Sequence, residues 1–272
     1  MLRTCVVTTV CLSALAACSR AAPPPTPVVA LPAGEFVDLS HTYDANTIFW
    51  PTAETFTLTK VADGETPAGY YYASNNFAGS EHGGTHIDAP VHFARGHQTV
   101  DQIPPDTLIA PAVVIDVTEA SAKNADYQAG VEDLARFEQQ YGRIPDGSMV
   151  VIKTGFANRW PNAQAYLGTA ERGDAAVARL HFPGLHPDAA KWIVENRRVK
   201  MLGIDTASID YGQSKLYETH RMLYSHDVPA LENLASLDRL PPTGTLLIAL
   251  PMKIGGGSGA PVRVVAVVPP SK

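Results

Sequence analysis

The sequence predicts a single α/β domain. Short apolar segments of strand length alternate with two segments of helical periodicity. The 272 residues suffice for one large domain, and neither an internal repeat nor a second proline-rich linker interrupts the chain after residue 32. A hydrophobic content of 45% is ordinary for a protein with a substantial core.

The N-terminal residues have the features of an export signal. Arg3 precedes an apolar run, residues 5–12, that is too short to span a bilayer. Residues 15–18, Leu-Ala-Ala-Cys, resemble a bacterial lipobox, in which the cysteine is lipidated; an ordinary signal peptide is the alternative. We therefore expect residues 1–17 to be a lipoprotein signal peptide, with membrane contact only through a lipid on Cys18.

The segment after this signal predicts a tether. Residues 18–32 are rich in proline and would be extended, and residues 33–272 would form the folded domain. Ser19 is not the aspartate typical of inner-membrane retention, so we expect a periplasmic location at the outer membrane. Cys5 and Cys11 would leave with the signal, so no internal disulfide is expected.

The net charge of the chain does not favour nucleic acid as a partner. The chain has 21 Lys and Arg against 27 Asp and Glu, a net charge of −6. Nothing in this balance suits binding to a nucleic-acid backbone, so nucleic acid is not an expected partner.

The first half of the domain predicts two strands and an aromatic loop. Residues 36–40 are expected to form the first strand and residues 70–77 the second. Between them, Phe49 and Trp50 precede a proline and mark an aromatic loop.

The second half predicts buried strands and two helices. Val131, Leu134 and Phe137 follow helical spacing over residues 131–141, and Gly142 would end that helix. A second helix is expected to begin at Pro187, since proline suits the first helical turn. Apolar strands are expected at residues 108–117, 148–154, 200–206, 246–250 and 262–268.

One histidine-rich stretch predicts a metal site. His82, His86, Asp88 and His92 all occupy even positions, so in one extended strand their side chains would share a face. Two glycines and a proline argue against a helix here. Imidazoles with a carboxylate bind Zn, Mn or Fe(II), and two His with one Asp leave positions open for water, as in catalytic sites. The alternative is hydrogen-bonded strand histidines, because nine His make some clustering expected by chance.

The same stretch resembles a known family. Residues 82–93 match the signature H-x-G-T-H-x-D-x-P-x-H-F of the cyclase family, metal-dependent hydrolases that include bacterial kynurenine formamidase and isatin hydrolase. Residues 205–212 and 250–254 resemble the isatin hydrolase branch more closely, and the likeness extends from about residue 36 to the C-terminus. It implies a mixed sheet forming a barrel-like core flanked by helices, and a homo-oligomer, either a dimer or a tetramer.

The resemblance also implies a second pair of metal ligands, a histidine and a glutamate twelve residues apart. His220 and Glu232 have that spacing, and His226 is the local alternative. Without the resemblance, Glu232 would be read as a solvated surface residue. Asp88 would bridge the two sets, giving one or two ions per subunit, either Mn²⁺ or Zn²⁺.

His92 is implied to be the general base and acid rather than a ligand, although a ligand role is the main alternative. Imidazole titrates near neutral pH and suits this proton transfer. The resemblance implies that Phe49 and Trp50 contact the substrate, and the alternative is that they only pack within their loop. Ser208 and Gln213, in the isatin-branch segment, are candidates for contacting the substrate or relaying protons. The alternative is that they are solvated loop side chains.

The implied function is hydrolysis of a cyclic or aryl amide by metal-bound hydroxide. Opening of isatin to isatinate is the first expectation, and hydrolysis of N-formylkynurenine by an arylformamidase is the alternative within the class. A non-catalytic, lipid-anchored protein that binds a metal or small molecule is the alternative outside it. The open ligand set and the position of His92 argue against that last alternative.

Overall fold

The computed structural model describes residues 33–270 of the chain. The predictions for residues 1–32, namely the signal peptide, the lipidated Cys18 and the tether, lie outside the described residues. In the described region, no helix has both the length and the apolar character needed to cross a membrane.

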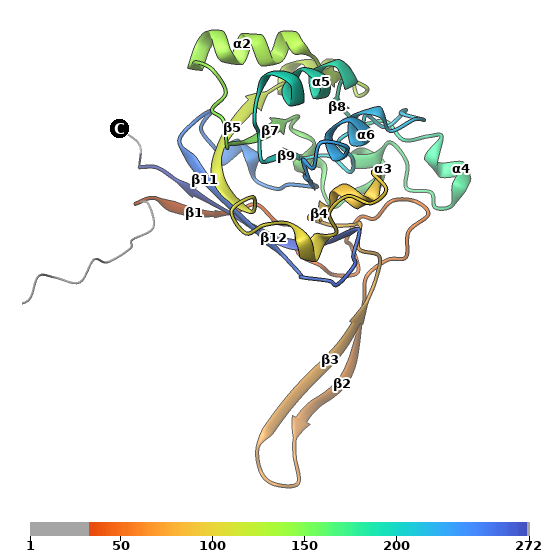
Figure 1. Cartoon of the computed structure of the whole chain (residues 1–272). Coiled ribbons are helices and arrows are strands. Elements are labelled where there is room, and N and C mark those ends of the chain that lie inside the picture. Colours follow the sequence, from red (N-terminus) through yellow and green to blue (C-terminus); the bar gives the residue numbers. More distant parts are fainter. Residues whose placement is uncertain (1–32, 271–272) are drawn as a thin grey trace, which may run out of the picture. The chain divides into compact units, whose positions relative to one another are not determined.

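The central feature is a mixed sheet of eight strands that closes into a barrel (Figure 1). The strands are β1 (Glu35–Asp38), β4 (His86–Asp88), β5 (Ile109–Asp116), β7 (Met149–Lys153), β9 (Met201–Ile204), β10 (Ala230–Glu232), β11 (Thr245–Pro251) and β12 (Gly259–Val268). Their order is β1-β12-β11-β5-β7-β9-β10-β4, and β4 also pairs with β12, which closes a ring of seven strands. The four strands β5, β7, β9 and β10 run parallel. The predicted barrel-like α/β fold is confirmed.

The parallel strands contain continuous apolar runs because each strand contributes side chains to two separate hydrophobic cores. In β5, Val114 belongs to the core inside the barrel, whereas its neighbours Val113 and Ile115 belong to the core between the sheet and the helices. In β7, Val151 and Ile152 divide in the same way. Both faces of these strands are therefore buried, and alternation of polar residues is lost.

Helices cover the outer face of the parallel strands. Leu134 of α2 (Val131–Tyr141), Ile193 of α5 (Pro187–Asn196) and Leu223 of α6 (Glu218–Tyr224) all lie in this outer core. Both predicted helices are present, α2 with the expected bounds. The shorter elements are α1 (Thr118–Lys123), α3 (Ala163–Leu167), α4 (Asp174–Val177), the 3-10 helices η1 (Pro90–His92), η2 (Val100–Gln102), η3 (Phe156–Arg159) and η4 (Leu237–Arg239), and the strand pair β6 (Gln128–Ala129) and β8 (Gly184–Leu185).

A two-stranded hairpin projects from the barrel (Figure 1). It consists of β2 (Thr57–Glu65) and β3 (Tyr71–Ala78), which pair antiparallel and are largely exposed along their length. Strand β3 was expected from the sequence. Its partner β2 was not, because its residues do not form an apolar run.

The expectation that one strand carries all four metal-type side chains is wrong. Strand β4 contains only His86 and Asp88 of the four. His82 lies in a bend before it, and His92 ends the 3-10 helix η1. Gly84, with φ +54°, adopts the left-handed conformation, which breaks the extended backbone between His82 and the strand.

Candidate metal centre

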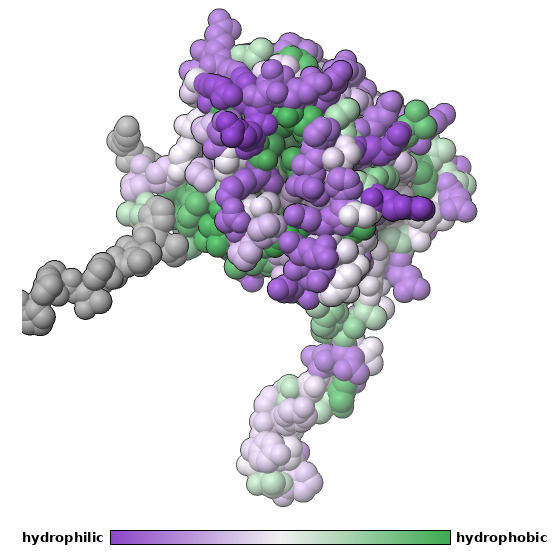
Figure 2. Space-filling view, in the orientation of Figure 1, coloured by the Kyte–Doolittle hydropathy of each residue, from purple (hydrophilic) through white to green (hydrophobic). Residues whose placement is uncertain are grey.

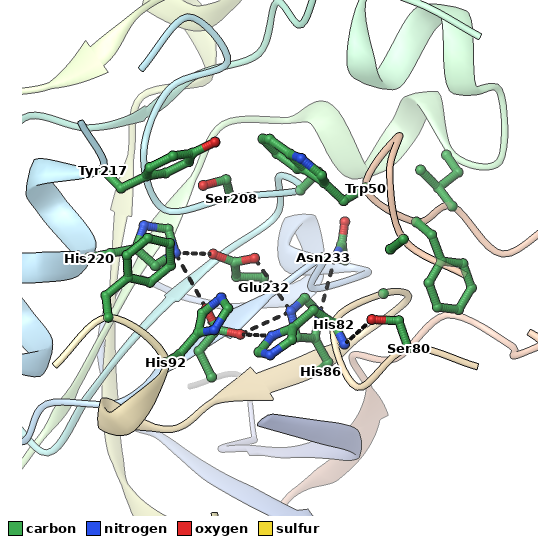
Figure 3. A pocket seen from close by; sticks show the side chains of 17 residues that line it. Trp50, Ser80, His82, His86, His92, Ser208, Tyr217, His220, Glu232 and Asn233 are labelled. Atoms are coloured by element: carbon green, nitrogen blue, oxygen red, sulfur yellow. Dashed lines mark hydrogen bonds and ion pairs between the residues drawn. The ribbon is translucent and has the colours of Figure 1, made fainter. Parts of the chain in front are cut away.

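Two overlapping groups of donor side chains line one cavity (Figure 3). His82, His86 and Asp88 form the first group, and Asp88, His220 and Glu232 form the second. In each group the potential ligand atoms lie within 4.8 Å of one another. The five predicted metal ligands therefore converge, and Asp88 belongs to both groups.

Strand pairing and one helix bring these residues together. His86 and Asp88 are two residues apart on β4 and share a face. Glu232 on β10 is the direct cross-strand partner of His86. His220 reaches the same place from α6, with its Nε2 3.2 Å from Glu232 Oε1 and 3.4 Å from Asp88 Oδ2. Its alternative, His226, is exposed and contacts the backbone carbonyl of Met222 instead.

The ring nitrogens that face away from the cluster are already engaged. His86 Nδ1 lies 3.0 Å from the carbonyl oxygen of Gly84, which can only accept, so Nδ1 carries the proton. His220 Nδ1 lies 2.5 Å from Asp210 Oδ2. Each ring thus points Nε2 at the cluster.

The donor set fits a divalent cation. His86 Nε2 is buried and has no hydrogen-bond partner among the described residues, although Asp88 Oδ1 is 3.1 Å away. With Nδ1 protonated, this nitrogen presents a lone pair to a carboxylate oxygen, and the two repel unless a positive charge lies between them. Imidazole nitrogen and carboxylate oxygen are the ligands that Zn²⁺ and Mn²⁺ accept.

The pKa shifts of the donor residues also indicate that the cluster favours a positive charge. Burial alone would lower the pKa of His86, but Asp88 and Glu232 outweigh it and raise the pKa to about 9. Burial and the adjacent charge of Asp88 raise the pKa of Glu232. Burial also opposes ionisation of Asp88, yet His82, His92 and their neighbours hold its pKa well below its usual value. Two buried carboxylates so close together require a compensating cation.

His92 lies beside the donors but belongs to neither group. Its ring stacks on that of His82, with centroids 3.9 Å apart. Burial lowers the pKa of His92 to about 4, so the ring is neutral near pH 7. A neutral imidazole next to the cation position is able to accept a proton.

A cavity of about 320 Å³ opens over the donors, lined mainly by apolar and aromatic side chains. Phe49, Trp50 and Ser208 all line it, as expected for substrate contacts. Gln213 does not; its side-chain amide donates to the carbonyl oxygen of Leu180. The geometry gives Gln213 a structural contact, and a role in substrate binding stays a prediction.

Several residues around the cluster had no role assigned from the sequence. Tyr224 donates to Asp88 Oδ2 at 2.8 Å, and Asp210 holds His220. Tyr224 lies four residues after His220, so helical spacing already placed both on one face. Tyr217, which lines the cavity, is one more such residue. The hydroxyl of Thr85 donates to the backbone carbonyl oxygen of Asn233 and accepts from the backbone N–H of His41, so it has no contact with a ligand side chain.

This barrel, with its buried imidazole and carboxylate cluster open to a cavity, defines a metal-dependent hydrolase. Residues 37–211 match the family model described as "Putative cyclase". The chain belongs to the cyclase family. Its site residues hold a divalent metal ion, and its reaction is hydrolysis of an amide C–N bond.

Named relatives and solved structures agree with this assignment. The chain is 33% identical to isatin hydrolase of Roseibium aggregatum over 209 residues, which cover 74% of this chain and 77% of that protein. It is 30% identical to kynurenine formamidase of Salinibacter ruber over 235 residues, covering 84% and 95%. Isatin hydrolase A from Ralstonia solanacearum superposes with a TM-score of 0.77 at 35% identity, covering 86% of this chain and 92% of that one.

Proposed function

We propose that the enzyme opens a flat, uncharged cyclic amide fused to an aromatic ring, with isatin as substrate and isatinate as product. The observation that carries this proposal is the lining of the cavity. Ile48, Phe49, Trp50, Phe93 and Tyr217 present apolar and aromatic surface, and in the described part of the chain no lysine or arginine lines the cavity. Its charged groups are those of the donor cluster.

The lining favours isatin over N-formylkynurenine. The latter is an amino acid, so its carboxylate and ammonium groups would enter the cavity without a cationic partner for the carboxylate. Isatin has no such charge, and its fused rings suit a slot beside Trp50 and Phe49. The formamidase activity remains the alternative, supported by the 30% identical relative.

In the proposed reaction, the oxygen of water bonds to the amide carbonyl carbon. The C–N bond breaks and the nitrogen takes up a proton, which gives a single ring-opened product that carries an aryl amine and a carboxylic acid. A divalent ion on the donor cluster would lower the pKa of water towards ~7 and stabilise negative charge on oxygen. His92 accepts the proton of the attacking water and returns it to the nitrogen, consistent with its neutral state.

The ion in the proposal is Mn²⁺ or Zn²⁺. Imidazole and carboxylate donors suit both ions. The two donor groups that share Asp88 accommodate one ion each, which supports one or two ions per subunit.

The enzyme is further proposed to be an exported lipoprotein, on the sequence features of residues 1–18 alone. Lipid on Cys18 would hold it on the periplasmic side of the outer membrane. Replacing Cys18 with Ser should move the protein from the membrane fraction to the soluble periplasmic fraction; an unchanged distribution would contradict the anchor.

A homo-oligomer is proposed as the working form. The β2–β3 hairpin supports this, because an isolated two-stranded ribbon is marginally stable in water. Leu58 and Phe77 are cross-strand partners and are 62% and 59% exposed. Figure 2 shows single hydrophobic residues on the projecting hairpin, among residues of weakly polar character. A second copy of the chain would cover this surface.

The substrate assignment is tested on purified protein loaded with Mn²⁺ or Zn²⁺. Isatin and N-formylkynurenine are supplied separately, and ring absorbance follows each reaction. We expect kcat/KM to be at least about tenfold higher for isatin, given that uncompensated burial of a charge costs more than one tenfold step. The reverse order would assign the formamidase activity. Absence of turnover with both substrates would favour the non-catalytic binding protein.

A further inference from the structure

His82 differs from the other two imidazoles of the cluster. It lies in a bend rather than in a strand or helix, and its side chain is 21% exposed, against 3% for His86 and 4% for His220. The backbone therefore fixes its ring less firmly. Its two nitrogens each face a side chain: Nδ1 lies 2.7 Å from Asp88 Oδ1, and Nε2 lies 2.8 Å from Ser258 Oγ.

The partners of Ser258 determine which nitrogen of His82 carries the proton. Ser258 Oγ lies 2.7 Å from Glu81 Oε2, and the backbone N–H of Ser258 donates to the same oxygen at 3.0 Å. A carboxylate can only accept, so the hydroxyl of Ser258 donates its single proton to Glu81. Its oxygen is then left to accept, and His82 Nε2 must be the donor. This leaves His82 Nδ1 with a lone pair that faces the first donor group.

The residues packed around His82 and Glu81 leave space for these side chains in the positions described. A Cβ at Gly259 would lie 2.6 Å from His82 Cε1, and a Cβ at Gly257 would lie 2.8 Å from Glu81 Oε1. Gly259 therefore leaves room for the ring of His82, and Gly257 leaves room for the carboxylate of Glu81. His92 stacks on the ring of His82. Ser258 lies 176 residues from His82 in sequence, so the loop between β11 and β12 forms one wall of the metal centre.

We propose that Ser258, held by Glu81, is a positioning residue that makes His82 present Nδ1 to the cation, whereas His86 and His220 present Nε2. This proposal rests on the metal site of the proposed function, but not on the identity of the substrate. Neither Ser258 nor Glu81 lines the cavity, so both act through His82. Groups that orient a metal-bound histidine typically change metal affinity 10- to 100-fold when removed.

The test measures metal binding without turnover. The metal-free full chain is titrated with Co²⁺ against a chelator, and the visible absorption of the Co²⁺ protein reports its ligand set. S258A is expected to bind Co²⁺ about 10- to 100-fold more weakly and to shift the absorption. S258T keeps a hydroxyl and should restore both. S121A, which removes another buried serine hydroxyl, in α1, is the matched control and should match the wild type.

A double-mutant cycle distinguishes a loss of Co²⁺ affinity that passes through His82 from a loss caused by misfolding of S258A. In the H82A background, S258A should weaken Co²⁺ binding no further, because its effect passes through His82. Affinity and spectrum unchanged in S258A, or equal weakening with and without His82, would overturn the proposal. If the wild type binds metal but hydrolyses neither amide, only the substrate proposal fails. If the wild type binds no metal, the metal site itself fails.

Discussion

Glu232 and His86 face each other across the antiparallel pair of β10 and β4, with Oε2 of Glu232 3.5 Å from Nε2 of His86. This register places a carboxylate from the second half of the chain against an imidazole of the histidine-rich stretch. Because side chains opposite each other in a sheet have close Cβ atoms, the pairing itself builds half of the metal centre.

Removing the charge of Glu232 should weaken metal binding. In E232Q, the amide oxygen can still accept the hydrogen bond from the backbone N–H of Ile209, now 2.8 Å from Oε1, so the fold should persist. Removing a group that only hydrogen-bonds a metal ligand already lowers metal affinity about 10- to 100-fold. We therefore expect at least about a tenfold loss of metal affinity when a direct ligand loses its charge. Competition titration measures it, with E195Q on the exposed face of α5 as control. Wild-type affinity in E232Q would show that Glu232 is not a ligand.

His92 should be needed for turnover but not for metal binding. Loss of general acid–base catalysis in H92A should lower kcat by about 10²- to 10⁴-fold. Elemental analysis should find the same metal content as in the wild type, because His92 lies in neither donor group. H97A, which removes a partly exposed histidine paired with Asp227, is the control. If H92A loses its metal, His92 is a ligand.

His41 should make stability depend on pH. Its ring stacks on Trp160, with centroids 4.0 Å apart, and burial lowers the pKa of His41 to about 4. In the unfolded chain the pKa is about 6.5, so the unfolded state binds the proton more readily. The contribution of neutral His41 to stability is therefore complete above about pH 6.5 and declines as pH falls towards 4.

Urea unfolding of the metal-free protein at pH 7 and pH 5 measures this contribution. H41F keeps an aromatic ring on Trp160 but has no titrating group. The wild type should lose more unfolding free energy between the two pH values than H41F does. An equal loss in both proteins would mean that His41 is protonated as easily in the folded state as in the unfolded one.

The hairpin should hold the oligomer together. Lysines at Leu58 and Phe77 place two charges on its apolar cross-strand pair, so the double variant L58K/F77K should have a lower mass in light scattering than the wild type. T59K/N76K adds the same charges at the next cross-strand pair and should keep the wild-type mass. A monomeric wild type, or a double variant of unchanged mass, would contradict the proposed assembly.

Much of the fold was predictable because burial shapes the sequence strongly. The apolar runs around Val114 and Val151 are buried on both faces, so their composition predicts the strands. Gly142 marks the end of α2, and Pro187 marks the start of α5. The closure of the barrel was not predictable from periodicity. It depends on β12 pairing with both β11 and β4, and long-range register leaves no local pattern.

The metal centre was predictable only in part from residue spacing. The even positions correctly identified His82 as a member of the donor cluster and His92 as its neighbour, but for a wrong reason, since neither lies in the strand with His86. Ser258 had no signal in the sequence, because its place beside His82 follows from the tertiary fold alone. Gln213 was selected because of its place in the segment that resembles the isatin hydrolase branch, yet its side-chain amide donates to the carbonyl oxygen of Leu180.

The central claim is that one cation is bound by His82, His86 and Asp88 together. Anomalous diffraction from crystals grown with Mn²⁺ tests it most directly. We predict a peak within coordination distance of His82 Nδ1, His86 Nε2 and a carboxylate oxygen of Asp88. A Mn²⁺ peak elsewhere in the molecule, with these three side chains in contact only with one another, would contradict the account.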